Sequence, residues 1–176
     1  MGRLRNGSNP SGNTDWETPD DLLDALEREF LGCAHAHPGE LAFDLDPCPY
    51  PDSEGRKGIS EYSPAEGKDG LTLPWYGTVF VNPPYGRGID KWVEKCYTEV
   101  ANGNAALVVA LLPSSTGTGW WQEWVMQATE IRYLKGRIKF VGTKDPAPFD
   151  SVIVVWRRGM LGWCRGTGWD WRNSGS

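Results

Sequence analysis

The four consecutive residues Asn82, Pro83, Pro84 and Tyr85 carry the clearest chemical signal in the sequence. They follow an apolar run, 78–81, that predicts a buried strand, and ligands of open α/β sheets bind beyond the carboxyl ends of strands. Asn82 offers a side-chain carbonyl oxygen and Pro83 a backbone carbonyl oxygen, so the pair suits an amino group with two hydrogens. Holding both hydrogens would aim the nitrogen lone pair at an electrophile. Tyr85 offers a flat face for a base, although a turn with a surface tyrosine has the same pattern.

Helices alternate with buried strands around this motif, which predicts a mainly parallel α/β sheet. The last strands are joined too closely for crossover helices, so we expect an antiparallel edge. We predict a helix that starts at Thr18 and Pro19 and stops at Gly32. Further helices are expected over 92–100 and 120–128, and strands over 41–46, 78–81, 105–112, 130–134, 137–141 and 151–157. Residues 47–77 are predicted to form a long irregular loop.

The length of 176 residues suits one domain, which we place over residues 15–160. Residues 1–14 are rich in Gly, Ser and Asn and are predicted to be disordered, and 161–176 to be a flexible tail. The sequence has no long apolar run and no apolar segment typical of a signal peptide, so we expect a cytoplasmic protein without a membrane span. A group of cysteines and histidines fits no standard zinc-finger spacing, so no metal is expected: Cys33, His35, His37 and Cys48.

The net charge of −5 by itself argues against nucleic acid as a partner. The stretch 131–144, however, contains five Lys or Arg residues and no carboxylate. Within it Arg137 and Lys139 alternate with Ile138 and Phe140, so both cations should point to one face and could contact phosphate. A solvated strand face would have the same pattern.

A set of short motifs, taken in order, resembles the phage-type DNA N6-adenine methyltransferases, which belong to the S-adenosylmethionine-dependent amino-methyltransferases. The resemblance runs from about residue 15 to residue 156. The motifs are DWETP (15–19), FDLDPC (43–48), KDGL (68–71), VNPPYG (81–86), DKW (90–92), ALLPSST (110–116), LKGRIKF (134–140) and APFDS (147–151). It implies a single-domain, Rossmann-like enzyme that transfers a methyl group from S-adenosylmethionine to adenine N6 in DNA, without a metal.

The resemblance also implies which residues bind the methionine part of the cofactor. Thr18 and the backbone near Trp16 would face the carboxylate, because a helix start with free N–H groups suits an anion. Asp44 or Asp46 would pair with the ammonium group, since a carboxylate at a strand end is costly without a partner. A plain helix cap and a turn-capping aspartate before Pro47 are the competing interpretations.

For the two adenine rings, the resemblance implies further roles. Asp69 would bind the amino group of the cofactor's adenine and Leu71 would pack on that ring, although Asp69 could be a turn aspartate before glycine. Phe149 would stack on the flipped target base opposite Tyr85, or it could be a core phenylalanine at the end of a hairpin. Flipping is needed because the amino group is paired inside a duplex.

One feature departs from most methyltransferases, whose first motif carries a Gly-x-Gly turn after its strand. Here the sequence PCPYP occupies residues 47–51 and the next glycine is Gly55. Related activities remain open, since cytosine N4 and protein glutamine also present an NH2 group. A serine in place of Asn82 would favour cytosine, and a glutamine enzyme would be expected to carry the Gly-x-Gly turn. A DNA-binding remnant without catalysis is the non-enzymatic alternative.

Overall fold

The computed structural model describes residues 15–32, 42–50, 59–63 and 66–173. The segment predicted to be disordered, 1–14, lies outside these residues.

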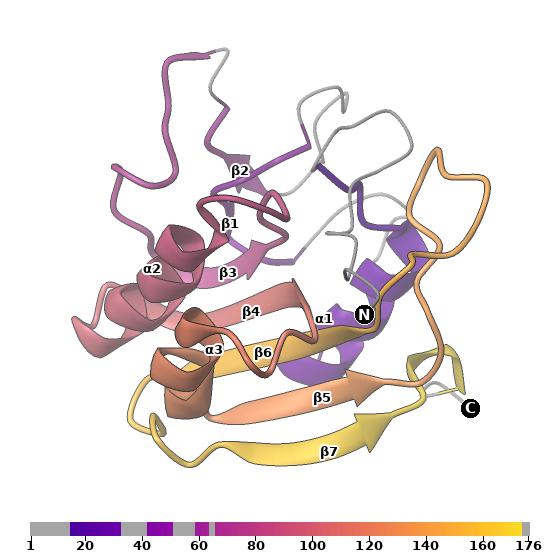
Figure 1. Cartoon of the computed structure of the whole chain (residues 1–176). Coiled ribbons are helices and arrows are strands. Elements are labelled where there is room, and N and C mark those ends of the chain that lie inside the picture. Colours follow the sequence, from indigo (N-terminus) through magenta and orange to yellow (C-terminus); the bar gives the residue numbers. More distant parts are fainter. Residues whose placement is uncertain (1–14, 33–41, 51–58, 64–65, 174–176) are drawn as a thin grey trace.

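The described residues form a seven-stranded sheet with the order β2-β1-β3-β4-β6-β5-β7 (Figure 1). Its strands are β1 Leu45–Asp46, β2 Ser60–Glu61, β3 Gly77–Val81, β4 Ala105–Pro113, β5 Glu130–Leu134, β6 Ser151–Arg157 and β7 Arg165–Trp169. The helices are α1 Asp20–Leu31, α2 Ile89–Ala101 and α3 Gly119–Glu123, with short 3-10 helices η2 Val125–Gln127 and η3 Trp171–Asn173. The α/β fold class with a mixed, mostly parallel sheet is therefore confirmed.

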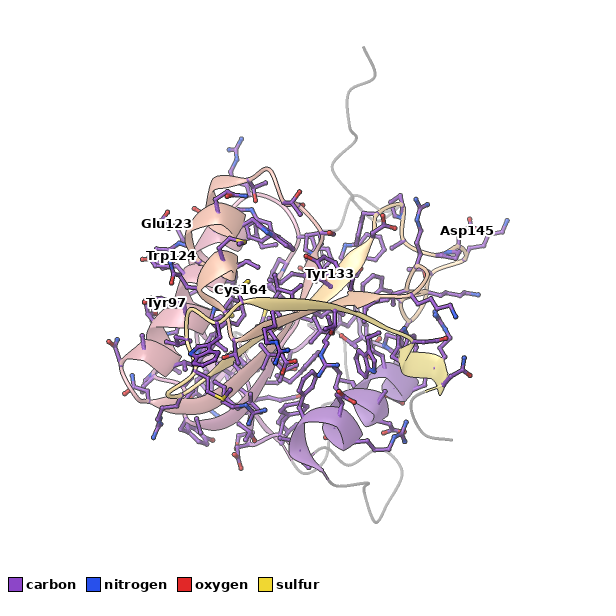
Figure 2. All side chains as sticks on the ribbon, turned by 90° about the horizontal axis from the view of Figure 1, so that it is seen from below. Tyr97, Glu123, Trp124, Tyr133, Asp145 and Cys164 are labelled. Carbon is purple, nitrogen blue, oxygen red and sulfur yellow. The ribbon has the colours of Figure 1, made fainter. Side chains whose placement is uncertain are left out.

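Helices cover both faces of this sheet. Figure 2 shows α1 on one side of the strands and α2 and α3 on the other. Tyr97 of α2 and Trp124, the residue after α3, bring these two helices together with ring centroids 5.3 Å apart. The central strands β3, β4 and β6 are almost wholly apolar, as expected for strands buried on both faces. Strand β3 lies in the core, and the motif that begins at Asn82 follows directly after its carboxyl end.

The direction of each strand follows from its neighbours. Strands β2, β1, β3 and β4 are mutually parallel, and β6 runs antiparallel to both β4 and β5. The sequence predicts the antiparallel strand at the edge, but it lies inside the sheet, because β5 and β7 pair beyond it in parallel. Because β6 runs antiparallel to β5, no crossover helix is needed between them, and residues 135–150 connect the two strands.

Most of the predicted elements are present within a few residues. Strands over 130–134 and 151–157 have the predicted limits. Pro19 is the residue before α1 rather than its first residue, and Gly32 ends that helix with φ 67°. Residues 120–128 form α3 and η2 rather than one helix.

The strand predicted over 137–141 is wrong. Gly136, with φ 76°, turns the chain away from the sheet after β5, and β7 takes the pairing edge of β5 instead. The predicted alternation of burial holds nevertheless: Ile138 is buried and Lys139 exposed. Ile138 accepts a hydrogen bond from Ala147 N–H at 2.8 Å, so the segment folds back as a loop. The cations therefore lie on a loop rather than on a strand face.

The prediction of a flexible tail over 161–176 is also corrected for its described part. Residues 165–169 form β7, which pairs in parallel with β5. Trp169 and Trp171 are buried, and Trp169 contacts Phe30 of α1 with ring centroids 6.1 Å apart. Only the last residue of this five-residue strand is buried, so the strand leaves no periodic pattern in the sequence. The folded domain extends through residue 173.

Removing this segment should therefore destabilise the protein. We expect a chain that ends at residue 160 to melt far below the full chain, because it loses β7 and two buried indoles. Loss of one large core side chain typically costs ~3–5 kcal/mol. A chain that ends at residue 173 is the control and should melt like the full chain in thermal denaturation. Equal melting of the shorter chain would show that β7 contributes nothing to stability.

Candidate active site

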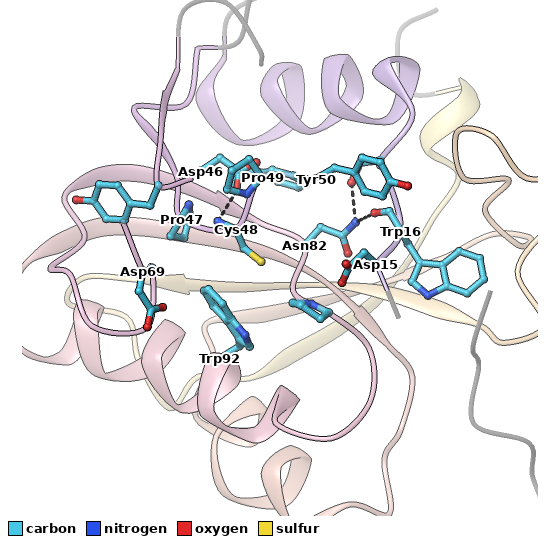
Figure 3. Close-up of a pocket in the computed structure, with 15 residues that line it drawn as sticks. Asp15, Trp16, Asp46, Pro47, Cys48, Pro49, Tyr50, Asp69, Asn82 and Trp92 are labelled. Carbon is cyan, nitrogen blue, oxygen red and sulfur yellow. Dashed lines mark hydrogen bonds between the residues drawn. The ribbon is translucent and has the colours of Figure 1, made fainter. Parts of the chain in front are cut away.

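A cavity of about 240 Å³ opens where β1 and β3 end (Figure 3). Its walls come from segments far apart in the chain: Asp15, Trp16 and Thr18 before α1, residues 46–50 at and after the end of β1, Tyr62, residues 69–70, Phe80, Asn82 and Pro84 around the end of β3, and Trp92 of α2. Six predicted site residues line it, namely Trp16, Thr18, Asp46, Asp69, Asn82 and Pro84. The fold thus gathers these six residues at one place, beyond the carboxyl ends of two parallel strands.

The side-chain amide of Asn82 has a fixed orientation. Its Nδ2 donates hydrogen bonds to the carbonyl oxygen of Trp16 and to Thr18 Oγ1, the latter at 3.0 Å. Because a backbone carbonyl can only accept, the amide nitrogen must face Trp16 and the oxygen must face the other way. Asn82 Oδ1 is buried and has no hydrogen-bond partner among the residues that the structure describes. A buried acceptor without a partner is costly, so it marks a place where a donor can bind.

The three aspartates that the sequence analysis assigns to the cofactor lie in different places in the structure. Asp46 is buried in the cavity wall, and its Oδ1 accepts a hydrogen bond from Cys48 N–H at 2.9 Å. Asp69 is exposed at the rim. Asp44 lies outside the cavity, where its Oδ2 accepts hydrogen bonds from the backbone N–H of Thr78 at 2.7 Å and from its hydroxyl at 2.9 Å. Asp44 therefore ties the chain before β1 to β3.

Cys48 is a cavity residue for which the sequence suggests no role in catalysis or cofactor binding. Burial, and then the negative charge of Asp46, raise the pKa of its thiol. The thiol is therefore neutral at physiological pH and acts as a small apolar part of the wall.

Trp92, rather than Leu71, supplies a ring wall to the cavity. Leu71 is half-buried and does not line the cavity, whereas Trp92 does. The Trp92 ring stacks on Trp75 with centroids 6.4 Å apart and an interplanar angle of 27°. Trp75 is buried, and its Nε1 donates a hydrogen bond to the carbonyl oxygen of Gly70 at 2.8 Å. In the sequence, Trp92 stands out through the DKW motif at 90–92. Its spacing within the predicted helix does not by itself assign it a function.

Gly70 lets two loops that border the cavity approach each other closely. A Cβ atom on Gly70 would lie 1.9 Å from the carbonyl oxygen of Pro47. No side chain fits there, so the residue-70 loop can rest directly on the chain that follows β1. This close approach brings Asp69 and Asp46 to the same cavity.

Glu99 of α2 stabilises the wall formed by Trp75 and Trp92. Its carboxylate accepts hydrogen bonds from Lys95 Nζ at 2.6 Å, Asn104 Nδ2 at 2.9 Å and Trp75 N–H at 3.2 Å. Burial alone would raise the pKa of Glu99, but these hydrogen bonds and the charge of Lys95 hold it below its ordinary value. The carboxylate is thus ionised at neutral pH and fixes the backbone at Trp75.

Four rings form an aromatic cluster beside Asn82: Trp16, Tyr85, Phe140 and Phe149. Tyr85 is buried, and its hydroxyl donates a hydrogen bond to the Leu111 carbonyl at 3.1 Å. Burial raises the pKa of Tyr85 well above its ordinary value. Phe149 meets Tyr85 edge to face with centroids 5.4 Å apart. The two residues predicted to sandwich a base are therefore brought together, but in direct contact, so no slot is open between them. Pro83 is buried next to them and does not line the cavity.

The stretch 131–144 is less positive in space than in sequence. Arg137 lies 3.4 Å from Asp150, and Lys135 lies 2.7 Å from Asp170. Arg132 also pairs with Glu29 and Glu130. The remaining cations, Lys139 and Lys144, form no salt bridge with any residue in the described ranges. The carboxylates that form these salt bridges lie outside residues 131–144, so the composition of that stretch could not predict them.

Two other structural features bear on the predictions. No helix in the described residues is long and apolar enough to span a membrane. Among those residues there is also no group of three or more His, Cys, Asp or Glu side chains that could hold a metal ion. Residues 33, 35 and 37 of the imagined zinc group lie outside them.

Comparison with known proteins gives one match. The sequence model of a family described as DNA N-6-adenine-methyltransferase (Dam) matches residues 8–158. No curated protein and no solved structure matches the chain. The matched residues contain every segment that lines the cavity.

Gly70 provides a test of how the cavity is built. We expect Gly70→Ala to lower the melting temperature, because the new Cβ collides with the Pro47 carbonyl and forces two loops apart; such overpacking typically costs ~1–3 kcal/mol. Gly117→Ala is the matched control, since Gly117 is exposed and an added Cβ there meets no atom within 4 Å. The control should melt like the unaltered protein. If both variants melted alike, the close approach of the two loops would not matter for stability.

Proposed function

The chain belongs to the DNA N-6-adenine-methyltransferase family, and from this premise we propose that it methylates N6 of a flipped adenine in DNA with S-adenosylmethionine. The observation that carries the proposal is the buried, unpartnered Oδ1 of Asn82 beside the cavity. An acceptor held ready for a hydrogen-bond donor is what an amino-group substrate requires.

Asn82 and Pro83 act on the amino group in this proposal. Asn82 Oδ1 accepts one amino hydrogen and the Pro83 carbonyl accepts the other, which directs the nitrogen lone pair out of the base plane. S-adenosylmethionine supplies an electrophilic methyl group when bound. As the nitrogen becomes positive, both hydrogen bonds strengthen, so they stabilise the transition state more than the bound substrate. A new N–C bond replaces the S–C bond, and one amino proton leaves to water.

The residues that line the cavity fit a cofactor with an ammonium group, a carboxylate and an adenine ring. Asp46, a buried carboxylate, suits the ammonium group. The start of α1 near Thr18 suits the carboxylate, because the first turn of a helix presents N–H groups to an anion. Asp69 at the rim can accept a hydrogen bond from the adenine amino group, and Trp92 offers a ring on which that adenine can stack. In this proposal Trp92 takes the place that the resemblance gave to Leu71, and Asp44 stays structural.

Entry of the target base requires a change in the aromatic cluster. Tyr85 is fixed by burial and by its hydrogen bond to Leu111, whereas Phe149 is half-buried and precedes β6 at the end of a loop. We propose that Phe149 moves aside and that the flipped adenine stacks on Tyr85 in its place. The stacking offsets part of the few kcal/mol that flipping costs.

The same loop carries the proposed contacts with DNA phosphates. Lys139 and Lys144 are both exposed and without salt bridges among described residues, so their charges are available to a polyanion. Arg137 is a secondary contact, because its exposed, 3.4 Å pair with Asp150 is weak and can exchange for phosphate.

Asn82 is the residue whose substitution tests the chemistry. We expect Asn82→Ala to slow methyl transfer by a factor that corresponds to about 2–4 kcal/mol, as when other catalytic hydrogen bonds are removed. The effect should fall on the single-turnover rate more than on DNA binding. The measurement is methyl transfer from S-adenosylmethionine to DNA, with the melting temperature recorded alongside.

Asn82→Asp is the matched variant, since it keeps an acceptor and removes the donor to Trp16 and Thr18. It should retain more activity than the alanine variant. Unchanged transfer by folded Asn82→Ala protein would refute the role of Asn82, and no transfer by the unaltered protein would refute the proposed activity.

The phosphate contacts predict a change in salt dependence. Replacing both Lys139 and Lys144 by Ala should reduce the slope of log affinity against log salt by about 1.8, or about 0.9 for each duplex phosphate that is no longer neutralised. Arg165→Ala is the control, because Arg165 is exposed at the start of β7, at the opposite end of the sheet from this loop. If Arg165→Ala reduced this slope as much as the double lysine variant does, the proposed phosphate contacts of Lys139 and Lys144 would be refuted.

A further inference from the structure

Two buried polar atoms beside the cavity lack partners, and they belong to residues that contact each other. Trp16 Nε1 is a donor and Asn82 Oδ1 an acceptor, and both are buried without a hydrogen-bond partner in the described part of the chain. The residues are joined by the hydrogen bond from Asn82 Nδ2 to the Trp16 carbonyl. An unpaired polar group is costly to bury, so an unpaired donor and an unpaired acceptor on two residues that contact each other suggest a common ligand.

The Trp16 ring lies on the target-base side of Asn82 rather than on the cofactor side. Figure 3 shows the indole on the far side of Asn82 from Asp69. The ring contacts Phe140 and Phe149 with centroids 5.0 Å and 5.5 Å apart. Both phenylalanines also contact Tyr85, so the Trp16 N–H is enclosed by the rings that the flipped base is proposed to join.

We propose that the Trp16 indole N–H donates a hydrogen bond to a ring nitrogen of the target adenine, N1 or N7, while Asn82 Oδ1 accepts from its amino group. This inference rests on the proposed function and concerns how the same site selects its base. Adenine presents an amino donor beside a ring-nitrogen acceptor on both edges, which complements an acceptor next to a donor. Guanine and thymine present an oxygen where adenine has its amino group, so each would face Asn82 Oδ1 with a second acceptor.

Trp16 is thus a specificity-determining residue through its side chain, in addition to the backbone role of its carbonyl. Displacement of Phe149 would expose the N–H as the base enters, and the ring nitrogen would then satisfy it. The N–H stays unpaired only while the site is empty of substrate.

Trp16→Phe removes the N–H and keeps an apolar ring, and Trp169→Phe is its matched control. Trp169 Nε1 is likewise buried and unpartnered, but its ring packs on Phe30 of α1, away from the cavity. Sequencing of modified bases in DNA treated with the unaltered protein first identifies the methylated adenine. Duplexes then carry adenine, 1-deazaadenine or 7-deazaadenine at that position, and single-turnover methyl transfer is measured for each protein.

For each protein, the rate with a deaza analogue is divided by the rate with adenine. For one of the two analogues, this ratio should be on the order of tenfold lower in the unaltered protein and in Trp169→Phe than in Trp16→Phe. Tenfold is the effect of one hydrogen bond. Changes in the intrinsic reactivity of the analogues cancel in this comparison, since all proteins receive the same substrates. The sensitive analogue identifies N1 or N7 as the acceptor.

The same adenine-to-analogue ratios for Trp16→Phe and the unaltered protein, at both positions, would overturn the role of the N–H and leave the proposed methylation intact. Absence of methylation by the unaltered protein would overturn both.

Discussion

The hydrogen bond from the Asn82 amide to the Trp16 carbonyl determines what the site can do. It joins the end of β3 to the chain that leads into α1, two segments that are 66 residues apart in sequence. Because the carbonyl can only accept, the bond turns the amide so that its oxygen is left buried and unpaired. The two residues that this bond joins therefore carry an unpaired acceptor, Asn82 Oδ1, and an unpaired donor, the Trp16 indole N–H, among the described residues. Without this tie Asn82 would be an ordinary polar residue at a strand end.

The other wall of the cavity depends on contacts that lie below it. Gly70 rests on the Pro47 carbonyl and receives the Trp75 indole N–H, while Glu99 holds the Trp75 backbone. Trp92 then stacks on Trp75 and faces the cavity. A buried carboxylate with three donors is rigid only when all are present, so this wall is a connected unit rather than a set of separate contacts.

The two walls differ in how they can move. The wall around Asp46, Gly70 and Trp75 is built from buried, hydrogen-bonded groups, whereas the aromatic cluster beside Asn82 includes the half-buried Phe149. Under the proposed function, a preformed cofactor site beside a base site that opens on binding would suit a substrate that must first leave a duplex. In the same proposal, the loop that ends at Phe149 would join phosphate contact and base entry in one segment.

The sequence by itself determined the fold class, most of the strands and the set of motifs, because buried strands and helix ends leave local patterns. It also placed Asn82 at a strand end and six of the lining residues in one site. Tertiary structure alone decided which aspartate enters the cavity, since Asp44 and Asp46 are two residues apart and differ only in what surrounds them. It also revealed Trp92, the role of Gly70 against Pro47, the salt bridges that neutralise part of the basic stretch, and β7. Each of these depends on atoms from distant segments meeting in space, and no local pattern records such a meeting.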